Sequence, residues 1–145
     1  MTESKRRSLI KPKLNSPFKI DFEWWKKNDR DWRVYLRSFL CEYHQEMFEE
    51  LDSDEVIDWV DPKTAEITQV DGMQHVLISH CAKQEGFVDE RRTLVDSVFR
   101  LLLSQGNRPM TPEEMGDILN RPPSTILRTL SGIRVYKGIR PVVED

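Results

Sequence analysis

The segment from Thr111 to Val143 constrains the fold of this chain more than any other. It opens with the sequence TPEE, the pattern of a helical capping box, in which a Thr caps the helix, a Pro fills its first position and a Glu lies three residues after the cap. The apolar residues expected on one face of this helix are Met115, Ile118 and Leu119. Two prolines, Pro122 and Pro123, follow, and the helix must end before them because neither has an N–H to donate.

A second helix is predicted directly after the prolines. Ser124 or Thr125 can cap its beginning, and Gly132 occupies the position of a left-handed C-cap residue. The apolar residues of its expected buried stripe are Ile126, Leu127 and Leu130. Strand-forming residues then flank a Lys-Gly turn at 137–138, so we predict a small β-hairpin from Ile133 to Val143.

Positive charge gathers in the same segment, although the whole chain has a formal charge of −3. No Asp or Glu lies between Ile118 and Val143. The basic residues of this stretch are Arg121, Arg128, Arg134, Lys137 and Arg140. Residues 1–19 hold six Lys or Arg residues and one Glu, whereas residues 20–60 hold twelve acidic residues and five basic ones. A basic surface on an otherwise acidic protein is the pattern expected of phosphate binding.

Residues from about Phe87 to Val143 resemble the winged helix-turn-helix superfamily, which includes many bacterial and archaeal transcription regulators. The resemblance rests on the order of the expected elements and on the sequence TPEEMGDILNRPPSTILRTLSG. It implies that the segment ERRTLVDSVFRLLLSQ, which Asp89 can cap and Gly106 can end, is the first helix of that domain. It also implies that the helix after the prolines is a recognition helix and that the hairpin is its wing.

The remainder of the chain gives less specific patterns. An aromatic group near the N-terminus packs either on the helix that follows it or on a partner. Its members are Phe18, Phe22, Trp24 and Trp25. A long amphipathic helix is predicted from Asn28 to about Leu51. The alternating sequences EVIDWV and AEITQV, joined by an Asp-Pro turn of about four residues, predict a β-hairpin, and a short buried helix is expected to end at Lys83.

These patterns predict a mainly α fold with small β-hairpins, of the α+β class, in which a helical N-terminal part precedes a C-terminal winged helix. Three regions are expected: a flexible basic arm over residues 1–19, a helical and β-hairpin domain over 20–84, and a winged helix-turn-helix domain over 85–145. The arm either follows a phosphate backbone or is a solvated tail. No apolar run is long enough to span a membrane, and the N-terminus lacks the apolar core of a secretory signal.

The expected recognition helix supplies most of the candidate DNA contacts. Arg128 can donate to a guanine edge or to a phosphate, and Ser124 and Thr125 lie near the beginning of the helix, where base edges are within reach. The remaining candidates, suited to the phosphate backbone or the minor groove, are Arg121, Thr129, Arg134, Lys137 and Arg140. Winged helices also dock on other proteins, so a protein partner is the alternative.

Two cysteines and three histidines raise the question of a metal site. Cys41 and His44 are three residues apart on one predicted helix, and His75, His80 and Cys81 lie on another, with His80 and Cys81 as the stronger candidates. Thiolates and imidazoles are zinc ligands, but neither pair has the spacing of a zinc finger or ribbon. Both lie in apolar stripes, where a cysteine acts as a small hydrophobe. We therefore predict core residues, with no metal and no cofactor, and no catalytic Cys–His pair, since neither an oxyanion hole nor a substrate cleft accompanies them.

The function predicted from the sequence is that of a non-enzymatic DNA-binding protein, either a transcription regulator or a chromosome-associated factor. Its expected partner is double-stranded DNA, and the aromatic helical part is expected to contact a second copy of the chain or another protein. The alternative is a winged-helix adaptor, for example in a transcription complex, without sequence-specific DNA binding. The two cysteines form no disulfide framework, which indicates a cytoplasmic protein.

Overall fold

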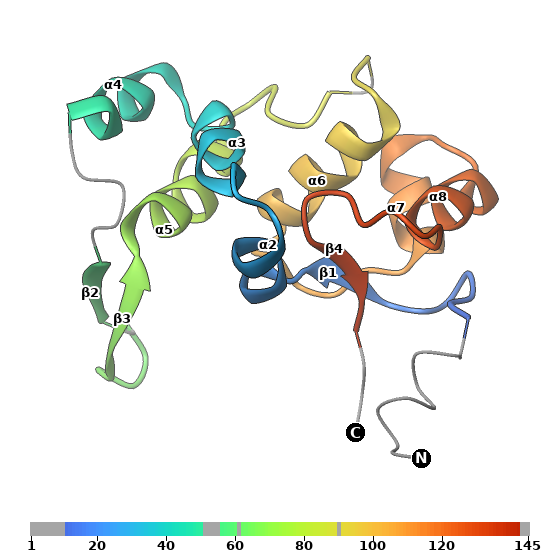
Figure 1. The fold of residues 1–145 in the computed structure, drawn as a ribbon, viewed down its shortest axis with the longest axis horizontal. Helices are drawn as coiled ribbons and strands as arrows, with labels where there is room; N and C mark the ends of the chain where they lie inside the picture. The colour runs from blue at the N-terminus through green and yellow to red at the C-terminus, as the bar shows by residue number, and fades with distance from the viewer. Residues whose placement is uncertain (1–10, 51–55, 61, 90, 143–145) are drawn as a thin grey trace. The chain divides into compact units, whose positions relative to one another are not determined.

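The computed structural model describes residues 11–50, 56–60, 62–89 and 91–142 (Figure 1). The chain divides into two compact units. Unit 1 contains residues 1–29 and 88–145, and unit 2 contains residues 30–87. Helices predominate among the described residues, and the strands form two small antiparallel sheets, which confirms the predicted mainly α, α+β class. None of the described helices is long and apolar enough to cross a membrane.

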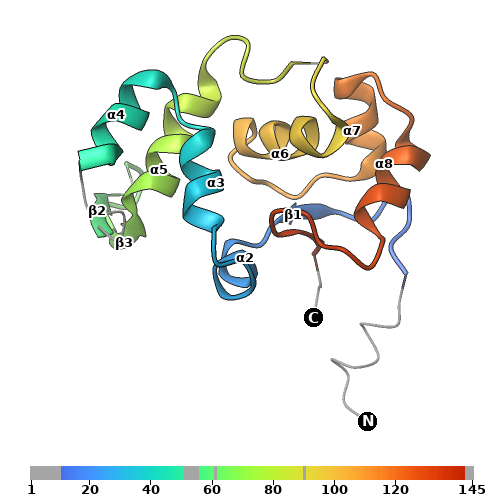
Figure 2. The same ribbon diagram turned by 45° about the horizontal axis from the view of Figure 1, so that its top comes forward.

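Unit 1 is built from segments at both ends of the chain. In chain order its elements are β1 (Phe18–Ile20), α2 (Phe22–Asn28), α6 (Leu94–Ser104), α7 (Pro112–Leu119), α8 (Pro123–Leu130) and β4 (Ile139–Pro141). Helix α6 packs on α7 and on β1, and α7 packs on α8 (Figure 2). The predicted division at residue 20 therefore differs from the structure, because α2 belongs with the C-terminal segment.

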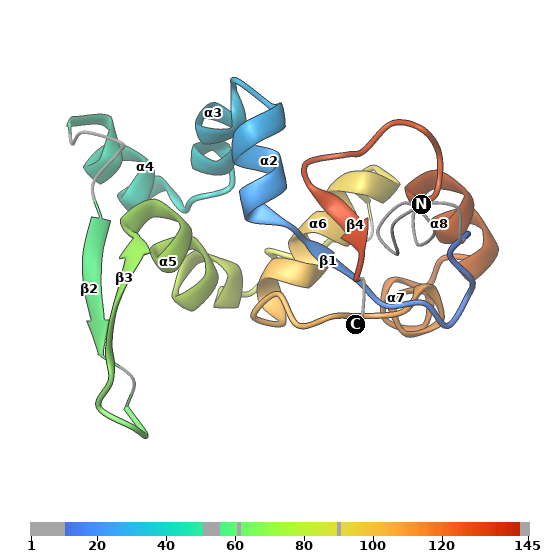
Figure 3. The ribbon, with the colours of Figure 1, turned by 60° about the horizontal axis from the view of Figure 1, so that its bottom comes forward.

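Strand β1 joins the two ends of unit 1. It pairs with β4 in an antiparallel register that sets Phe18 opposite Pro141 and Ile20 opposite Ile139 (Figure 3). On its other edge, the backbone of Phe18 exchanges hydrogen bonds of 2.8 and 2.9 Å with that of Met110. Phe18 and Ile20 are 0% and 1% exposed, whereas Lys19 between them is exposed. The strand is thus central to the core of unit 1.

The side chain of Asn107 extends the same edge of β1. Its Oδ1 accepts from the Ile20 N–H at 2.8 Å, and its Nδ2 donates to the Ile20 carbonyl at 2.9 Å. Asn107 has φ 61°, a left-handed conformation that asparagine tolerates better than most residues. One side-chain amide therefore satisfies the two backbone groups that a further strand would otherwise pair.

Two predictions about the ends of the chain are wrong. The predicted flexible arm over residues 1–19 includes β1, which is held in the core; residues 1–10 lie outside the described residues. The predicted C-terminal hairpin is also not formed up to Val142, because β4 pairs with β1. The Lys-Gly turn is present, with positive φ at both residues and a 2.9 Å bond from the Ile139 N–H to the Tyr136 carbonyl.

Unit 2 contains three α-helices, one 3₁₀ turn and a hairpin among its described residues. The elements are α3 (Trp32–Ser38), α4 (Glu42–Glu50), β2 (Val56–Val60), β3 (Ile67–Asp71), α5 (Gly72–Ser79) and η1 (Cys81–Lys83). Strands β2 and β3 confirm the predicted hairpin, with Val56 opposite Asp71 and Val60 opposite Ile67. Their connection is longer than the predicted four residues and includes Ala65 at φ 62°.

The single helix predicted from Asn28 to Leu51 is wrong. Asn28 ends α2, and the chain turns again between α3 and α4. At this second turn the Gln45 side chain donates to the carbonyl of Leu40 at 2.9 Å. A side chain thereby satisfies a carbonyl that a continuous helix would pair with its own backbone. The apolar stripe expected along this helix is also only partly buried: Trp32, Phe39 and Phe48 are buried, whereas Tyr35 and Tyr43 are exposed.

Candidate nucleic-acid interface

Helices α7 and α8 form the predicted helix, tight turn and helix. Thr111 and Glu114 make the capping box in both directions: the Glu114 N–H donates to Thr111 Oγ1, and the Thr111 N–H donates to Glu114 Oε1, each at 3.1 Å. Asn120 ends α7 in the left-handed conformation, with φ 55° and ψ 48°. Pro123 then occupies the first turn of α8, where a missing N–H costs nothing.

Gly116 allows this turn to be tight. A Cβ at this position would lie 2.7 Å from the Arg121 carbonyl oxygen and 2.9 Å from Pro123 Cγ, both closer than packed atoms tolerate. The Arg121 N–H also donates to the Gly116 carbonyl at 3.1 Å. No role for Gly116 was predicted from the sequence, although a glycine inside an amphipathic helix is itself a signal of close packing.

Two details of the predicted helix faces need correction. Ile118, expected to be buried with Met115 and Leu119, is 49% exposed, and Gly116 takes its place on the inner face. In α8, Ile126 and Leu130 are buried as predicted, while Leu127 is only half-buried. The predicted C-cap at Gly132 is also wrong, since Ser131 ends the helix with φ −99°.

We expect the change Thr111→Ala to lower the free energy of unfolding by about 1 kcal/mol, because it removes the N-cap acceptor of α7. The Thr111 N–H that donates to the Glu114 carboxylate is the main cause of that group's lowered pKa. The Glu114 contribution is therefore present above its ordinary pKa and is lost as the pH falls through the lowered one. Urea unfolding at neutral and acidic pH measures both effects. An unchanged midpoint in Thr111→Ala at neutral pH would contradict the capping role.

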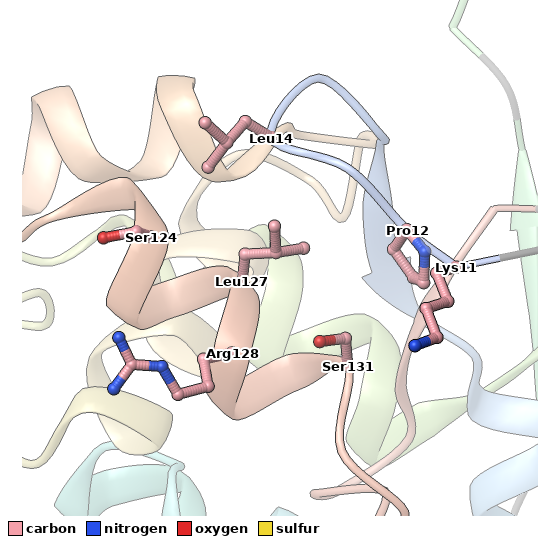
Figure 4. Close-up of a pocket in the computed structure, with 7 residues that line it drawn as sticks. All are labelled: Lys11, Pro12, Leu14, Ser124, Leu127, Arg128 and Ser131. Carbon is pink, nitrogen blue, oxygen red and sulfur yellow. The ribbon is translucent and has the colours of Figure 1, made fainter.

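The solvent-facing side of α8 borders a hollow in the surface. The hollow is lined by Lys11, Pro12, Leu14, Ser124, Leu127, Arg128 and Ser131 (Figure 4). Leu127 is directed from α8 toward the N-terminal segment, while the guanidinium group of Arg128 extends away from Lys11. Ser124 and Arg128 are exposed, and none of the residues lining this hollow is acidic. Two predicted DNA contacts thus lie on one accessible face.

The N-terminal segment beside α8 is fixed by hydrogen bonds that the sequence did not indicate. The Leu14 carbonyl accepts from the Glu113 N–H at 3.3 Å. A turn closes between Lys13 and Ser16, where the Lys13 N–H donates to Ser16 Oγ at 2.8 Å. Lys11 was therefore missed as a neighbour of Arg128. Only the basic composition of the N-terminus could have suggested it.

The other predicted contacts on α8 and its turn are partly engaged within the protein. Thr125 and Thr129 are half-buried, and Thr129 Oγ1 donates to the Thr125 carbonyl at 2.9 Å. Arg121 Nη2 donates to the Arg92 carbonyl at 2.9 Å, which holds the turn against the segment that precedes α6. These three residues lie next to the exposed face of α8 but have structural contacts of their own.

The three basic residues of the C-terminal segment have different surroundings. Arg134 is exposed, with its guanidinium carbon 5.0 Å from the centre of the Tyr136 ring. Lys137 is half-buried in the turn. Arg140 Nη1 lies 3.2 Å from Asp21 Oδ2, and its guanidinium also lies over the Trp24 ring. The charge of Arg140 is therefore offset by Asp21, which makes it a weaker candidate for phosphate binding than Arg134.

The aromatic group near the N-terminus, for which the sequence left open the following helix or a partner, lies largely within the core. Trp25 is 1% exposed, packs edge-on against Phe99 at 5.5 Å and donates from Nε1 to Asp29. In unit 2, Trp32 is also buried. The exposed large apolar or aromatic side chains of α3 and α4 are Val34, Tyr35, Tyr43 and Met47.

The candidate zinc ligands are brought together in unit 2. Cys41 Sγ lies 3.1 Å from His44 Nδ1, and Cys81 Sγ lies 3.6 Å from both. The ligand atoms of Cys41, His44 and His80 all lie within 4.8 Å of one another. Burial raises the pKa of the Cys81 thiol to about 11. Burial, and then the nearby His80, lower the pKa of His44. This convergence differs from the predicted role of separate core residues.

No family model, curated protein or solved structure matches this chain.

Proposed function

We propose that this chain is a cytoplasmic, non-enzymatic DNA-binding protein and that unit 1 is a winged-helix domain acting in transcription regulation or chromosome organisation. In this proposal α8 enters the major groove of double-stranded DNA. The order of α6, α7 and α8, with a short turn between the last two, supports it because the same order presents a recognition helix in winged helices.

The observation that carries the proposal is the exposed face of α8 that bears Arg128 beside Lys11. Arg128 is exposed one turn after Ser124, and Lys11 lies across the same hollow. An arginine can donate two hydrogen bonds to the O6 and N7 atoms of guanine, whereas a lysine beside it favours a phosphate. Among the described residues, no acidic side chain lines the hollow, which favours a positive local potential.

The remaining residues would assist in positioning the duplex. Thr125 can offer its methyl group or hydroxyl to a base edge, and Arg134 and Lys137 can contact phosphates from the loop that follows α8. This loop takes the place of a hairpin wing, because its returning strand β4 pairs with β1. Arg121 and Arg140 would act mainly by holding the turn and β4 in place.

The test compares Arg128→Ala with the wild type in binding to a fluorescent duplex over a series of salt concentrations. We expect affinity to fall steeply with salt in the wild type and to fall about 10- to 100-fold in Arg128→Ala at low salt. Each lost phosphate contact reduces the slope of log K against log salt by about 0.9. Lys27→Ala, which removes an exposed charge from α2 in the same unit, is the matched control and should bind as the wild type does.

A second function, docking on another protein, is favoured by the apolar part of the same hollow. Pro12, Leu14 and Leu127 line it, and Leu14 is 38% exposed. The same binding experiment separates the two functions. If no duplex binds at low salt, the DNA proposal fails and protein docking is the better account. If Arg128→Ala and Lys27→Ala weaken binding equally, the proposal that α8 enters the major groove fails.

A further inference from the structure

The four candidate metal ligands lie at two junctions of unit 2. Cys41 immediately precedes α4, and His44 follows in the first turn of that helix. His80 ends α5, and Cys81 begins the 3₁₀ turn η1. The two pairs belong to segments about 40 residues apart in the chain, yet the Cys81 and Cys41 sulfur atoms are separated by 3.6 Å. Folding of unit 2 therefore creates the cluster.

The separations among the ligand atoms of Cys41, His44 and Cys81 suit one tetrahedral ion. Zinc binds sulfur at about 2.3 Å and imidazole nitrogen at about 2.0–2.1 Å, so the donor atoms around it lie roughly 3.3–3.8 Å apart. Two of the separations, Cys81 Sγ to Cys41 Sγ and Cys81 Sγ to His44 Nδ1, are both 3.6 Å. The third, from Cys41 Sγ to His44 Nδ1, is 3.1 Å, which a small side-chain rotation brings into the same range.

His80 is the fourth candidate ligand. Its ring centre lies 4.7 Å from that of His44, with the ring planes at 72° to one another. Its ligand atom lies within 4.8 Å of those of Cys41 and His44. His80 is exposed, whereas Cys81 is 1% exposed, so the cluster extends from the interior of unit 2 to its surface. An ion can therefore reach the cluster from solvent.

We propose that unit 2 binds one Zn²⁺ through Cys41, His44, His80 and Cys81. Two thiolates and two imidazoles form a closed tetrahedral set, which is typical of structural zinc sites, and this mixture of ligands favours zinc over magnesium or calcium. On binding, each thiol gives up its proton to solvent and each imidazole binds as the neutral ring. The bound ion would carry no open position for a substrate.

A core role for these residues explains the geometry less well. A cysteine that acts only as a small hydrophobe is expected to contact apolar atoms. Here both sulfur atoms and the Nδ1 of His44 instead approach one another. A bound ion would also stabilise unit 2. A unit of roughly 60 residues buries a small core and gains stability from a metal that links distant segments.

The test measures bound metal in the purified full-length chain after growth with zinc and dialysis against metal-free buffer. One zinc per chain, by elemental analysis, is the expected result. Replacement of zinc by Co²⁺ should give the visible absorption of a tetrahedral, sulfur-ligated ion. We expect Cys41→Ser to lose most of the zinc and His80→Gln to bind it at least tenfold more weakly.

His75→Gln is the matched control, since His75 lies on α5 but outside the cluster, and it should retain one zinc per chain. If Cys41→Ser fails to fold, His80→Gln still tests the proposal, because His80 is exposed and its substitution should leave the fold intact. Far-UV circular dichroism of His80→Gln checks that it does. The proposal is overturned if the wild type holds no zinc and gives no tetrahedral cobalt spectrum. A loss of two hydrogens in the non-reduced intact mass, which indicates a Cys41–Cys81 disulfide, or zinc binding unchanged in His80→Gln, would overturn it too.

Discussion

The change Phe18→Ala is expected to lower the free energy of unfolding of unit 1 by about 3–5 kcal/mol, the usual cost of removing a buried aromatic ring. Phe18 is 0% exposed, and its backbone bonds to Met110 on one edge of β1 while its neighbours in the strand pair with β4 on the other. The cavity cannot collapse easily, because three separate segments fix the backbone around it. Urea unfolding followed by far-UV circular dichroism measures the effect.

Lys19→Ala is the matched control for this prediction. Lys19 is the next residue in the same strand, but its side chain faces solvent, so the substitution should change the free energy of unfolding by no more than about 0.5 kcal/mol. Equal effects of the two substitutions would show that β1 is a peripheral strand. Such a result would restore the flexible arm that the basic composition of the N-terminus predicted.

The contrast between β1 and α7 shows what the sequence could reveal in unit 1. The capping box and the two prolines act through residues within a few positions of one another, so they predicted α7, the turn and the presence of α8 correctly. The cap predicted at Ser124 or Thr125 is wrong, because Pro122 is the N-cap residue and no side chain among the described residues caps α8. The pairing of Phe18 with Pro141 depends on residues at opposite ends of the chain. No local pattern encodes that partner, and the strand formers around residues 137–138 supported a hairpin equally well.

The candidate sites could likewise be predicted from the sequence only where they depend on residues close together in the chain. Basic composition and helix order identified Arg128 and Ser124 as accessible residues of α8, and both are exposed. The position of Lys11 beside them depends on how the N-terminal segment crosses the surface. For the cysteines and histidines, the residue types suggested zinc, but the two pairs lacked a known spacing. Only the fold of unit 2 shows that Cys81 meets Cys41 and His44.

The second prediction with a large effect concerns Asp71, which has two roles in unit 2. Its Oδ2 lies 2.7 Å from Arg33 Nη2, and its Oδ1 accepts from the Gln74 N–H at 3.0 Å as the N-cap of α5. The Asp71 side chain is 7% exposed and that of Arg33 is 22% exposed. The Asp71 end of the ion pair is therefore largely shielded from solvent, whereas the Arg33 end is partly accessible.

We expect Asp71→Ala to cost about 3–5 kcal/mol in the free energy of unfolding of unit 2. Loss of one partner leaves a poorly solvated charge, which accounts for most of the cost, and loss of the N-cap adds about 1 kcal/mol. Asp71→Asn keeps an oxygen at the cap but removes the charge, so it should cost less. Hydrogen exchange in peptides that cover β3 and α5 locates the effect in unit 2, independently of unit 1.

A double-mutant cycle with Arg33→Met decides between the two causes. If the ion pair dominates, Arg33→Met should recover a large part of the stability that Asp71→Asn loses, because no unpaired charge is left in the half-buried site. If the cap dominates, the two substitutions should simply add. A cost below about 1 kcal/mol for Asp71→Ala would exclude both roles, and the link from α3 to the start of α5 would then have to depend on apolar packing alone.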